Sequence, residues 1–258
     1  MCYWVGTKKI REEMSRRFKE GTRDEIVQLF YKAFIENNAS DFKEYYVAIG
    51  KGKPVLTTLV KENGKLQFRN MVWTLPYSYF DKKSSKIVTR ELLNSMCERV
   101  FFQHKEIIFK QRCIIPIDGY FEFYHFNGEN YPYFINPSER GMFYAGGIWD
   151  GKVNQETGEV IESFSIITTP PNPLVSKIHN NPKAPNGPRM LLLINQEKAL
   201  EYLNADLNTE GIKKFFVPYD EKEMKAHTVL KFLKKENTLQ FIDSPKVQEY
   251  FNYPELAA

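Results

Sequence analysis

Long apolar runs are absent from this sequence of 258 residues. The run from Met190 to Ile194 is among the longest, at five residues, whereas a membrane-spanning helix needs about 18 or more. The amino-terminal residues also lack the order of a secretory signal, in which a charged segment precedes an apolar one. We therefore expect no membrane segment and a cytoplasmic location.

Cysteine and histidine are scarce, and their spacing matches no known metal motif. The three cysteines and four histidines occur singly, without C-x-x-C or H-x-x-x-H, which argues against a structural zinc site. An odd number of cysteines in an apparently intracellular chain argues against a disulfide framework. The glycine-rich phosphate motifs of nucleotide-binding proteins are missing as well. We expect no metal and no cofactor.

Internal repeats, low-complexity tracts and Gly/Ser-rich linkers are also absent, so we predict one domain spanning residues 1–258. Hydrophobic residues make up 42% of the chain and charged residues 26%, a balance that supports a sizeable core. The net charge of +4 does not by itself predict a nucleic-acid-binding protein.

The hydrophobic pattern predicts many short strands grouped along the chain, with helices around them. Strands are expected at Tyr46–Ile49, Pro54–Val60, Lys65–Leu75, Arg112–Ile117, Tyr120–Phe126, Tyr133–Asn136, Met142–Trp149 and Val160–Thr168. Helices are expected at Asp24–Ile35, Ser95–Ile108, Gln196–Asn204 and Asn208–Lys214. Thr22 and Glu25 form a capping-box pattern before the first helix. The fold class predicted is α+β, a single domain with a curled, mostly antiparallel, barrel-like β-sheet flanked by helices.

Cys2 carries unusual chemistry for its position. Removal of Met1 would place a thiol and a free α-amine on one residue, with ordinary pKa values of about 8.5 and about 7.7 to 8.0. An aldehyde is the natural electrophile for this pair, because amine attack gives a Schiff base and the thiolate can then close a five-membered thiazolidine. Taken alone, a cysteine at this position is more often incidental or a small buried hydrophobic residue.

Two further polar residues lie in unusual surroundings. Glu122 follows an Asp118-Gly119 turn inside an aromatic strand, where partial desolvation would suit it to proton transfer. His179 lies in a loop-like segment that could present an imidazole to a cleft. An outward-facing strand glutamate and a surface histidine are the alternatives.

Four features in the same order resemble the SOS-response-associated peptidase family: Cys2, Asn94 followed by Glu98, the stretch Arg112–Phe123, and Ile178-His179 with a later Arg189-Met190. The stretch is the most specific, since its twelve consecutive residues follow the pattern R-C-[apolar]-x-P-x-D-G-[aromatic]-[aromatic]-E-[aromatic].

This resemblance implies a single α+β domain that captures ring-opened abasic sites of single-stranded DNA as a thiazolidine crosslink. It implies that Cys2 is the nucleophile after autoproteolytic removal of Met1, and that Asn94 orients the amine or the sugar. Glu122 would act as acid and base, and His179 would assist ring opening.

The DNA contacts implied are less specific. Thr168 would line the pocket, Trp4 and Trp73 could stack on bases, and Arg189 could hold phosphate. Core or surface packing is the alternative for each tryptophan and for Arg189. We expect a monomer whose partner is single-stranded DNA with abasic sites, associated with the nucleoid when bound.

Two other functions stay open. A cysteine peptidase that uses Cys2 as its amino-terminal nucleophile would turn over peptides in trans. A noncovalent reader of single-stranded or modified DNA would bind in a salt-sensitive manner that survives Cys2→Ser.

Overall fold

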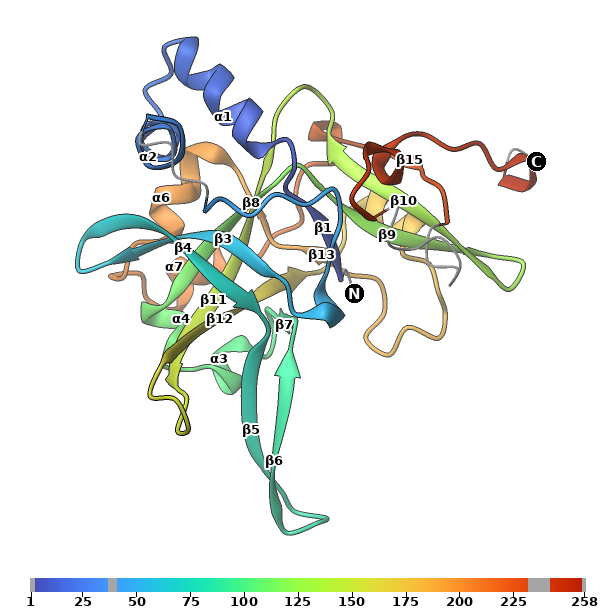
Figure 1. Ribbon diagram of the computed structural model, residues 1–258. Helices are drawn as coiled ribbons and strands as arrows, with labels where there is room; N and C mark the ends of the chain where they lie inside the picture. The colour runs from blue at the N-terminus through green and yellow to red at the C-terminus, as the bar shows by residue number, and fades with distance from the viewer. Residues whose placement is uncertain (1–2, 37–40, 232–241, 257–258) are drawn as a thin grey trace.

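The structure, a computed structural model, describes residues 3–36, 41–231 and 242–256. Five strands close into a barrel-like sheet (Figure 1). Around the ring they are β12 (Val160–Thr169), β4 (Lys65–Trp73), β3 (Val55–Glu62), β8 (Arg112–Ile117) and β11 (Phe143–Val153), and β11 pairs back onto β12. Every pair in the ring is antiparallel except β12 with β4. The predicted curled, mostly antiparallel sheet is confirmed.

A second sheet lies against the barrel and contains the strand after the Asp-Gly turn. Its order is β15 (Met224–Thr228), β10 (Glu129–Pro137), β9 (Gly119–Phe126), β1 (Trp4–Gly6) and β2 (Ala48–Ile49). Only Asp118 separates β8 from β9, so the chain passes directly from the barrel into this sheet. Three short strands complete the barrel's edges: β7 (Asn94–Met96) and β13 (Met190–Leu191) on β12, and β14 (Leu193–Ile194) on β11.

Tight turns set the register of two hairpins. Asn63 and Gly64 join β3 to β4 with φ angles of 51° and 77°, and Asn127 and Gly128 join β9 to β10 with 49° and 82°. Two consecutive left-handed residues make the type I′ turn, whose twist matches that of the flanking strands. The strands predicted at Pro54–Val60 and Lys65–Leu75 thus pair as a hairpin.

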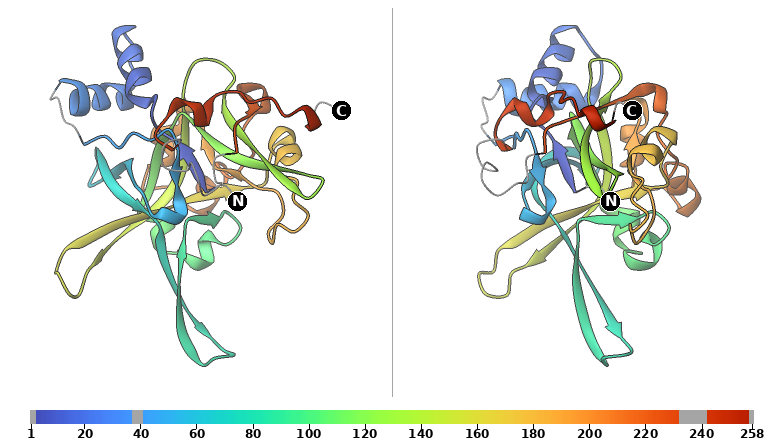
Figure 2. Two further views of the ribbon diagram at one scale, coloured as in Figure 1. Left: turned by 45° about the vertical axis from the view of Figure 1, so that its right-hand side comes forward. Right: turned by 90° about the vertical axis from the view of Figure 1, so that its right-hand side faces the viewer.

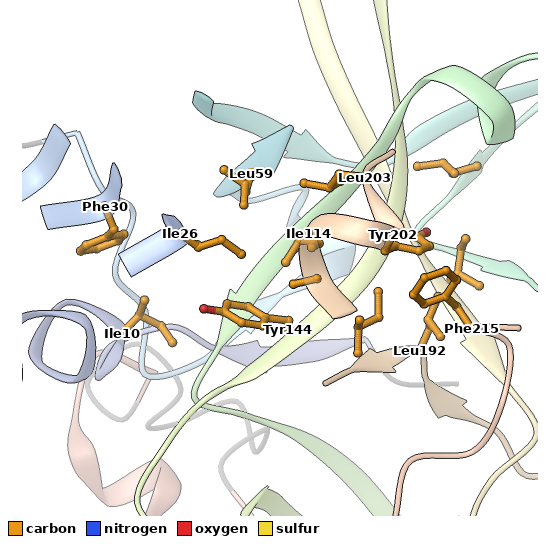
Figure 3. Close-up of a cluster of buried hydrophobic side chains, with 14 of the residues drawn as sticks. Ile10, Ile26, Phe30, Leu59, Ile114, Tyr144, Leu192, Tyr202, Leu203 and Phe215 are labelled. Atoms are coloured by element: carbon orange, nitrogen blue, oxygen red, sulfur yellow. The ribbon is translucent and has the colours of Figure 1, made fainter. Parts of the chain in front are cut away.

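Strand β8 is buried on both faces, which explains its unbroken apolar sequence. Ile115 faces the cluster inside the barrel, and Ile114 faces a second cluster outside it. Figure 3 shows that outer cluster, in which side chains of helices cover the barrel: Ile10, Ile26 and Phe30 from the first two helices, and Tyr202, Leu203 and Phe215 from the carboxyl-terminal half. Burying one such side chain contributes about 1.5 to 3 kcal/mol.

The helices are short. The α-helices are α1 (Ile10–Lys19), α2 (Glu25–Phe30), α3 (Val100–Gln103), α4 (Ile107–Lys110), α5 (Pro173–Ile178), α6 (Ala199–Tyr202) and α7 (Thr209–Lys213). A π-helix, η1 (Tyr31–Glu36), extends α2, and 3₁₀ turns are η2 (Gly50–Gly52), η3 (Gln196–Lys198), η4 (Glu221–Glu223), η5 (Pro245–Gln248) and η6 (Pro254–Leu256). None of the helices in the described ranges is long and apolar enough to span a membrane.

The predicted helix Asp24–Ile35 is confirmed as α2 with η1, but the capping-box interpretation is wrong. Asp24 is the N-cap, and its side chain accepts a hydrogen bond from Ile26 N at 2.8 Å. Thr22 lies outside the helix and accepts from Asp24 N at 3.2 Å. Aspartate caps as well as threonine does, so the true helix start lies two residues further along the chain.

The predicted helix Ser95–Ile108 is also wrong. Its first residues form β7, which pairs in parallel with β12, and only two short helices, α3 and α4, follow. Ser95 lies in this strand, and its buried hydroxyl contacts that of Ser165 at 2.9 Å. Pairing with β12 overrides the local helical period. Asn94 is therefore on a strand, as the family resemblance implies.

One hairpin was not predicted from the sequence. The expected strand Lys65–Leu75 ends as β4 at Trp73, and β5 (Leu75–Asp81) then pairs with β6 (Lys86–Leu92) as a separate two-stranded sheet. Figure 2 shows from two sides that this hairpin projects away from the body of the protein.

Candidate active site

Glu122 lies in the middle of β9, with only 3% of its surface exposed. Strand alternation places it on the same side of β9 as Tyr120, which belongs to the barrel-interior cluster. Its Oε1 atom has no hydrogen-bond partner within the described part of the chain. Burial raises the pKa of Glu122 to about 7, because the charged form loses its water. Near neutral pH this carboxyl therefore exists in both forms, as an acid–base catalyst requires.

His179 lies directly beside this carboxyl. It ends α5, a helix capped at its start by Asn172, whose side chain accepts from Val175 N at 2.9 Å. His179 is 5% exposed, and its Nδ1 lies 3.6 Å from Glu122 Oε2. The same Nδ1 is 3.1 Å from the Arg189 carbonyl oxygen and 3.3 Å from the Arg189 amide nitrogen, so it finds a partner as donor or as acceptor. Burial lowers the pKa of His179, which favours the neutral ring.

Asn180 fixes the distance between α5 and β9. Its side-chain amide donates to His125 O at 3.0 Å, and its carbonyl oxygen accepts from His125 N at 2.6 Å. These two bonds attach the residue after His179 to the strand of Glu122. Sequence reasoning missed this residue, because its partner His125 is 55 residues away along the chain.

The buried carboxyl predicts a pH-dependent gain of stability in Glu122→Gln. The folded pKa, about 7, lies above the ordinary value of 4.5, so the folded state keeps a proton that the unfolded state has released. The resulting loss of stability grows as pH rises from about 4.5 to about 7 and is fully present above that range. Glutamine removes the penalty. Thermal unfolding at pH 8 should show the variant more stable than the wild type by about 5 °C, with a smaller difference at pH 5.

The control for this measurement is Glu159→Gln, at an exposed position before β12. The difference in unfolding temperature between this variant and the wild type should be the same at pH 5 and at pH 8. A Glu122→Gln variant with equal differences at pH 5 and pH 8 would show that the carboxyl ionises normally in the folded protein.

Asn94 begins β7 and is 8% exposed. It lines a cavity of about 470 Å³ that lies at the root of the β5–β6 hairpin. In the register with β12, Asn94 pairs with Ile166, and Thr168 follows two residues later. Thr168 is 1% exposed. The structure thus places Asn94 and Thr168 on neighbouring strands at one end of the barrel.

Arg189 connects these strands to His179. Its guanidinium donates from Nε to Thr168 Oγ1 at 3.0 Å and from Nη2 to Thr168 O at 2.7 Å. The same group forms a forked pair with the Glu98 carboxylate, at 3.1 and 2.8 Å. The side chain is buried, with 4% of the residue exposed. The Arg189 guanidinium is therefore bound to two segments of the protein, and the Arg189 backbone contacts His179.

Both tryptophans proposed from the resemblance are enclosed by protein. Trp73 is fully buried; its indole donates to Leu93 O at 2.8 Å and stacks on Phe164 at 6.4 Å. Because Leu93 precedes Asn94, Trp73 supports the strand that carries Asn94. Trp4 is 8% exposed and meets Phe123 edge to face at 4.8 Å. Neither ring offers an open face on which a base could stack.

Cys2, the predicted nucleophile, lies outside the described residues. The residues after it are firmly placed: β1 pairs with β9 in the register Trp4 with Phe121 and Gly6 with Gly119. Asp118 holds the end of β1 and the residues after it: Asp118 N donates to Gly6 O at 2.9 Å, and the Asp118 carboxylate accepts from Lys9 N at 2.9 Å. A Cβ on Gly6 would overlap that carboxylate, so only glycine fits there. Burial raises the pKa of Asp118 to about 6.

No group of three or more histidine, cysteine, aspartate or glutamate side chains in the described ranges could hold a metal ion. Cys97 and Cys113 are buried free thiols, and burial raises the pKa of Cys113 above its ordinary range. Glu122 and His179, 3.6 Å apart, are the buried ionisable side chains that the structure brings together at this site.

Comparison with known proteins decides the family. The family model described as SOS response associated peptidase (SRAP) matches residues 1–235. The chain belongs to this family. The resemblance inferred from the Arg112–Phe123 stretch is confirmed. SRAP relatives include the abasic site processing protein YoqW of Bacillus subtilis (strain 168), 25% identical over 195 residues, which are 73% of this chain and 82% of YoqW.

A second relative of B. subtilis, abasic site processing protein YobE, is 23% identical over 177 residues, which are 67% of this chain and 76% of YobE. Among solved structures, a protein from Bacteroides thetaiotaomicron matches with a TM-score of 0.71 and 25% identity, covering 97% of this chain and all of that one. A Bordetella bronchiseptica protein matches with a TM-score of 0.64 and 18% identity, covering 89% of this chain and all of that one. The barrel and its flanking helices are therefore the fold of the family.

Proposed function

We propose that this protein processes abasic sites in single-stranded DNA by covalent capture at Cys2. The observation that carries the proposal is the buried pair of Glu122 and His179, 3.6 Å apart. The names of the two B. subtilis relatives, abasic site processing proteins, support the class of substrate.

The amino terminus can reach this pair. Strand β1 runs antiparallel to β9, with Trp4 opposite Phe121, so the chain upstream of Trp4 continues toward the Glu122 end of β9. Consecutive Cα atoms are about 3.8 Å apart, which limits the Cα of Cys2 to about 7.6 Å from that of Trp4. A thiol and an amine on Cys2 are therefore within reach of a sugar bound beside Glu122.

The reaction balances without a cofactor. Hydrolysis of the Met1–Cys2 peptide bond consumes one water and frees the α-amine. The amine adds to the aldehyde of the ring-opened sugar, and loss of one water leaves a Schiff base. The thiol then adds across the C=N bond, so that sulfur bonds to carbon, the proton goes to nitrogen, and a thiazolidine forms.

Glu122 and His179 divide the proton transfers. Protonated Glu122 donates to the oxygen that leaves as water, and its ionised form accepts the proton of the attacking amine or thiol. Neutral His179 assists opening of the sugar ring. Asn94 orients the amine or the sugar, Thr168 lines the pocket, and Arg189 and Trp73 hold the strands that present these groups. We propose a monomer with one domain over residues 1–258, acting in the cytoplasm and on the nucleoid when DNA-bound.

The decisive experiment combines a denaturing gel with intact mass spectrometry. Wild-type protein that has lost Met1 should form a heat-stable band with an oligonucleotide carrying one abasic site. The band should be absent for Cys2→Ala and for DNA with a tetrahydrofuran analogue, which has no aldehyde. The crosslink mass should equal the sum of protein and DNA minus one water.

The other outcomes separate the alternatives. Salt-sensitive DNA binding that survives Cys2→Ser without any crosslink would contradict capture and favour a noncovalent reader. Turnover of peptides in trans, lost in Cys2→Ala and without reaction at abasic DNA, would favour a peptidase.

A further inference from the structure

One face of the β5–β6 hairpin carries aromatic and basic side chains that have no role in the chemistry proposed at Cys2. In its antiparallel register Tyr77 lies opposite Arg90, and Tyr79 lies opposite Val88. Residues opposite each other, and residues two apart on one strand, point to the same side. The two tyrosines and Arg90 therefore share a face, which we call the tyrosine face.

The aromatic rings on the tyrosine face form a continuous surface. The rings of Tyr77 and Tyr79 are nearly parallel, at 19°, with centroids 5.8 Å apart, and the Arg90 guanidinium lies 5.3 Å from the centre of the Tyr79 ring. Two planar rings side by side, with a guanidinium beside them, match successive bases and the phosphate between them.

This face adjoins Asn94, one of the candidate site residues. Tyr77, Tyr79 and Arg90 line the same cavity of about 470 Å³ as Asn94. The chain itself joins the hairpin to Asn94, because β6 ends at Leu92 and β7 begins at Asn94. A strand of DNA with its abasic sugar beside Asn94 would thus run onto the hairpin.

Charge also favours a nucleic acid. Arg99, which lines the cavity as well, and Arg90 are both exposed, and neither has an ion pair with another described residue. Glu91 lies on the opposite face of the hairpin and pairs with Lys53 at 2.6 Å. Asp81 lies two residues after Tyr79 on the tyrosine face; its hydrogen bonds with Ser84 in the turn, and to a smaller extent the charge of Arg90, lower its pKa. Two guanidinium groups therefore border the cavity, and Asp81 is the acid that interacts with Arg90.

We propose that the tyrosine face and Arg99 bind the unpaired nucleotides on one side of the abasic site. Bases stack on Tyr77 and Tyr79, and Arg90 and Arg99 contact the phosphates. This inference rests on the proposed function for the identity of the DNA, and it adds a binding subsite for the flanking strand.

The test measures equilibrium binding by fluorescence anisotropy, with a single-stranded oligonucleotide that carries the unreactive tetrahydrofuran analogue and several nucleotides on both sides. Tyr77→Ala and Tyr79→Ala should each weaken binding about 10-fold, the effect of losing one stacked base. Arg90→Ala and Arg99→Ala should each reduce the slope of log K against log salt by about 0.7.

The matched control is Phe80→Ala. Phe80 follows Tyr79 on β5, so its side chain points to the opposite face of the hairpin, and it is 62% exposed; its removal should leave affinity unchanged. On an oligonucleotide trimmed to the analogue and its immediate neighbours, the tyrosine variants and the wild type should bind alike. Unfolding temperatures equal to that of the wild type would show that the hairpin variants fold.

Two results would overturn the subsite: tyrosine variants that bind the long oligonucleotide as tightly as the wild type does, or a loss in Phe80→Ala as large as theirs. Because the analogue has no aldehyde, this outcome is independent of capture at Cys2. A protein that bound as expected but never crosslinked would contradict the proposed function and still support the subsite.

Discussion

Glu122→Gln should slow crosslinking to abasic single-stranded DNA about 100-fold at pH 7, the lower end of what a positioned acid–base group contributes. Glutamine keeps the shape of the side chain in its buried position, 3% exposed, but it neither gives nor takes a proton. The measurement is the single-turnover rate at saturating DNA, followed as the shifted band on a denaturing gel. Glu159→Gln should react at the wild-type rate.

The pH dependence of the crosslinking rate tests the acid–base role of Glu122 independently of how much Glu122→Gln slows the reaction. The wild-type rate should rise with deprotonation of the amine, whose ordinary pKa is about 7.7 to 8.0, and fall as Glu122 loses its proton through a pKa of about 7. A bell-shaped curve results. The Glu122→Gln variant should keep only the rising limb, and a variant with the full bell would show that another group supplies the acid.

Glu122→Gln is also expected to change the reaction rate and the stability of the protein in opposite directions. The same substitution that slows the reaction removes a buried ionisation and stabilises the fold above pH 7. Replacing a residue that merely supported the sheet would lower both the reaction rate and the stability of the protein. The combination of a slower reaction and a higher unfolding temperature therefore identifies a group retained for chemistry at a cost in stability.

The strands could be predicted because their signals are local. Arg112–Ile117 has the predicted bounds as β8, since its apolar run ends at Asp118-Gly119, where the chain bends into β9, and is buried on both faces. The helix predicted at Ser95–Ile108 failed because β7 depends on β12, some 70 residues away, for its hydrogen bonds. The two strands of the β5–β6 hairpin, LPYSYFD and KIVTREL, mix aromatic, apolar and charged residues without a strict alternation, so no period of two marked the hairpin.

Candidate site residues could be chosen from the sequence one by one, and their roles stay predictions, but their arrangement could not be predicted. Glu122 and His179 each stand out by local sequence, yet their proximity follows from the attachment of α5 to β9 through Asn180. The surroundings of Arg189 and Trp73 could likewise not be predicted from the sequence. Residue type alone does not tell whether an arginine or a tryptophan contacts DNA or holds strands together. Burial separates the two uses, and burial is a property of the fold.

Arg189→Met should destabilise the protein by about 3 kcal/mol, because removing one partner of a buried charged network leaves the others unsatisfied. The Thr168 hydroxyl loses its donor, at 3.0 Å in the wild type, and the Thr168 carbonyl oxygen loses one of two donors, at 2.7 Å, while it keeps Cys97 N at 3.0 Å. Glu98 is half exposed and can regain water, which keeps the loss at the lower end for such sites. Denaturant unfolding measures it.

Arg189→Lys should recover little of that loss, because an ammonium cannot reproduce the fork that reaches Thr168 and Glu98 together. The control is Arg140→Met, whose side chain is 63% exposed and pairs with Glu12; it should cost less than about 1 kcal/mol. A different result for Arg189→Met, with wild-type stability but weakened and less salt-sensitive DNA binding, would mean that the guanidinium leaves Thr168 to hold phosphate when DNA is bound.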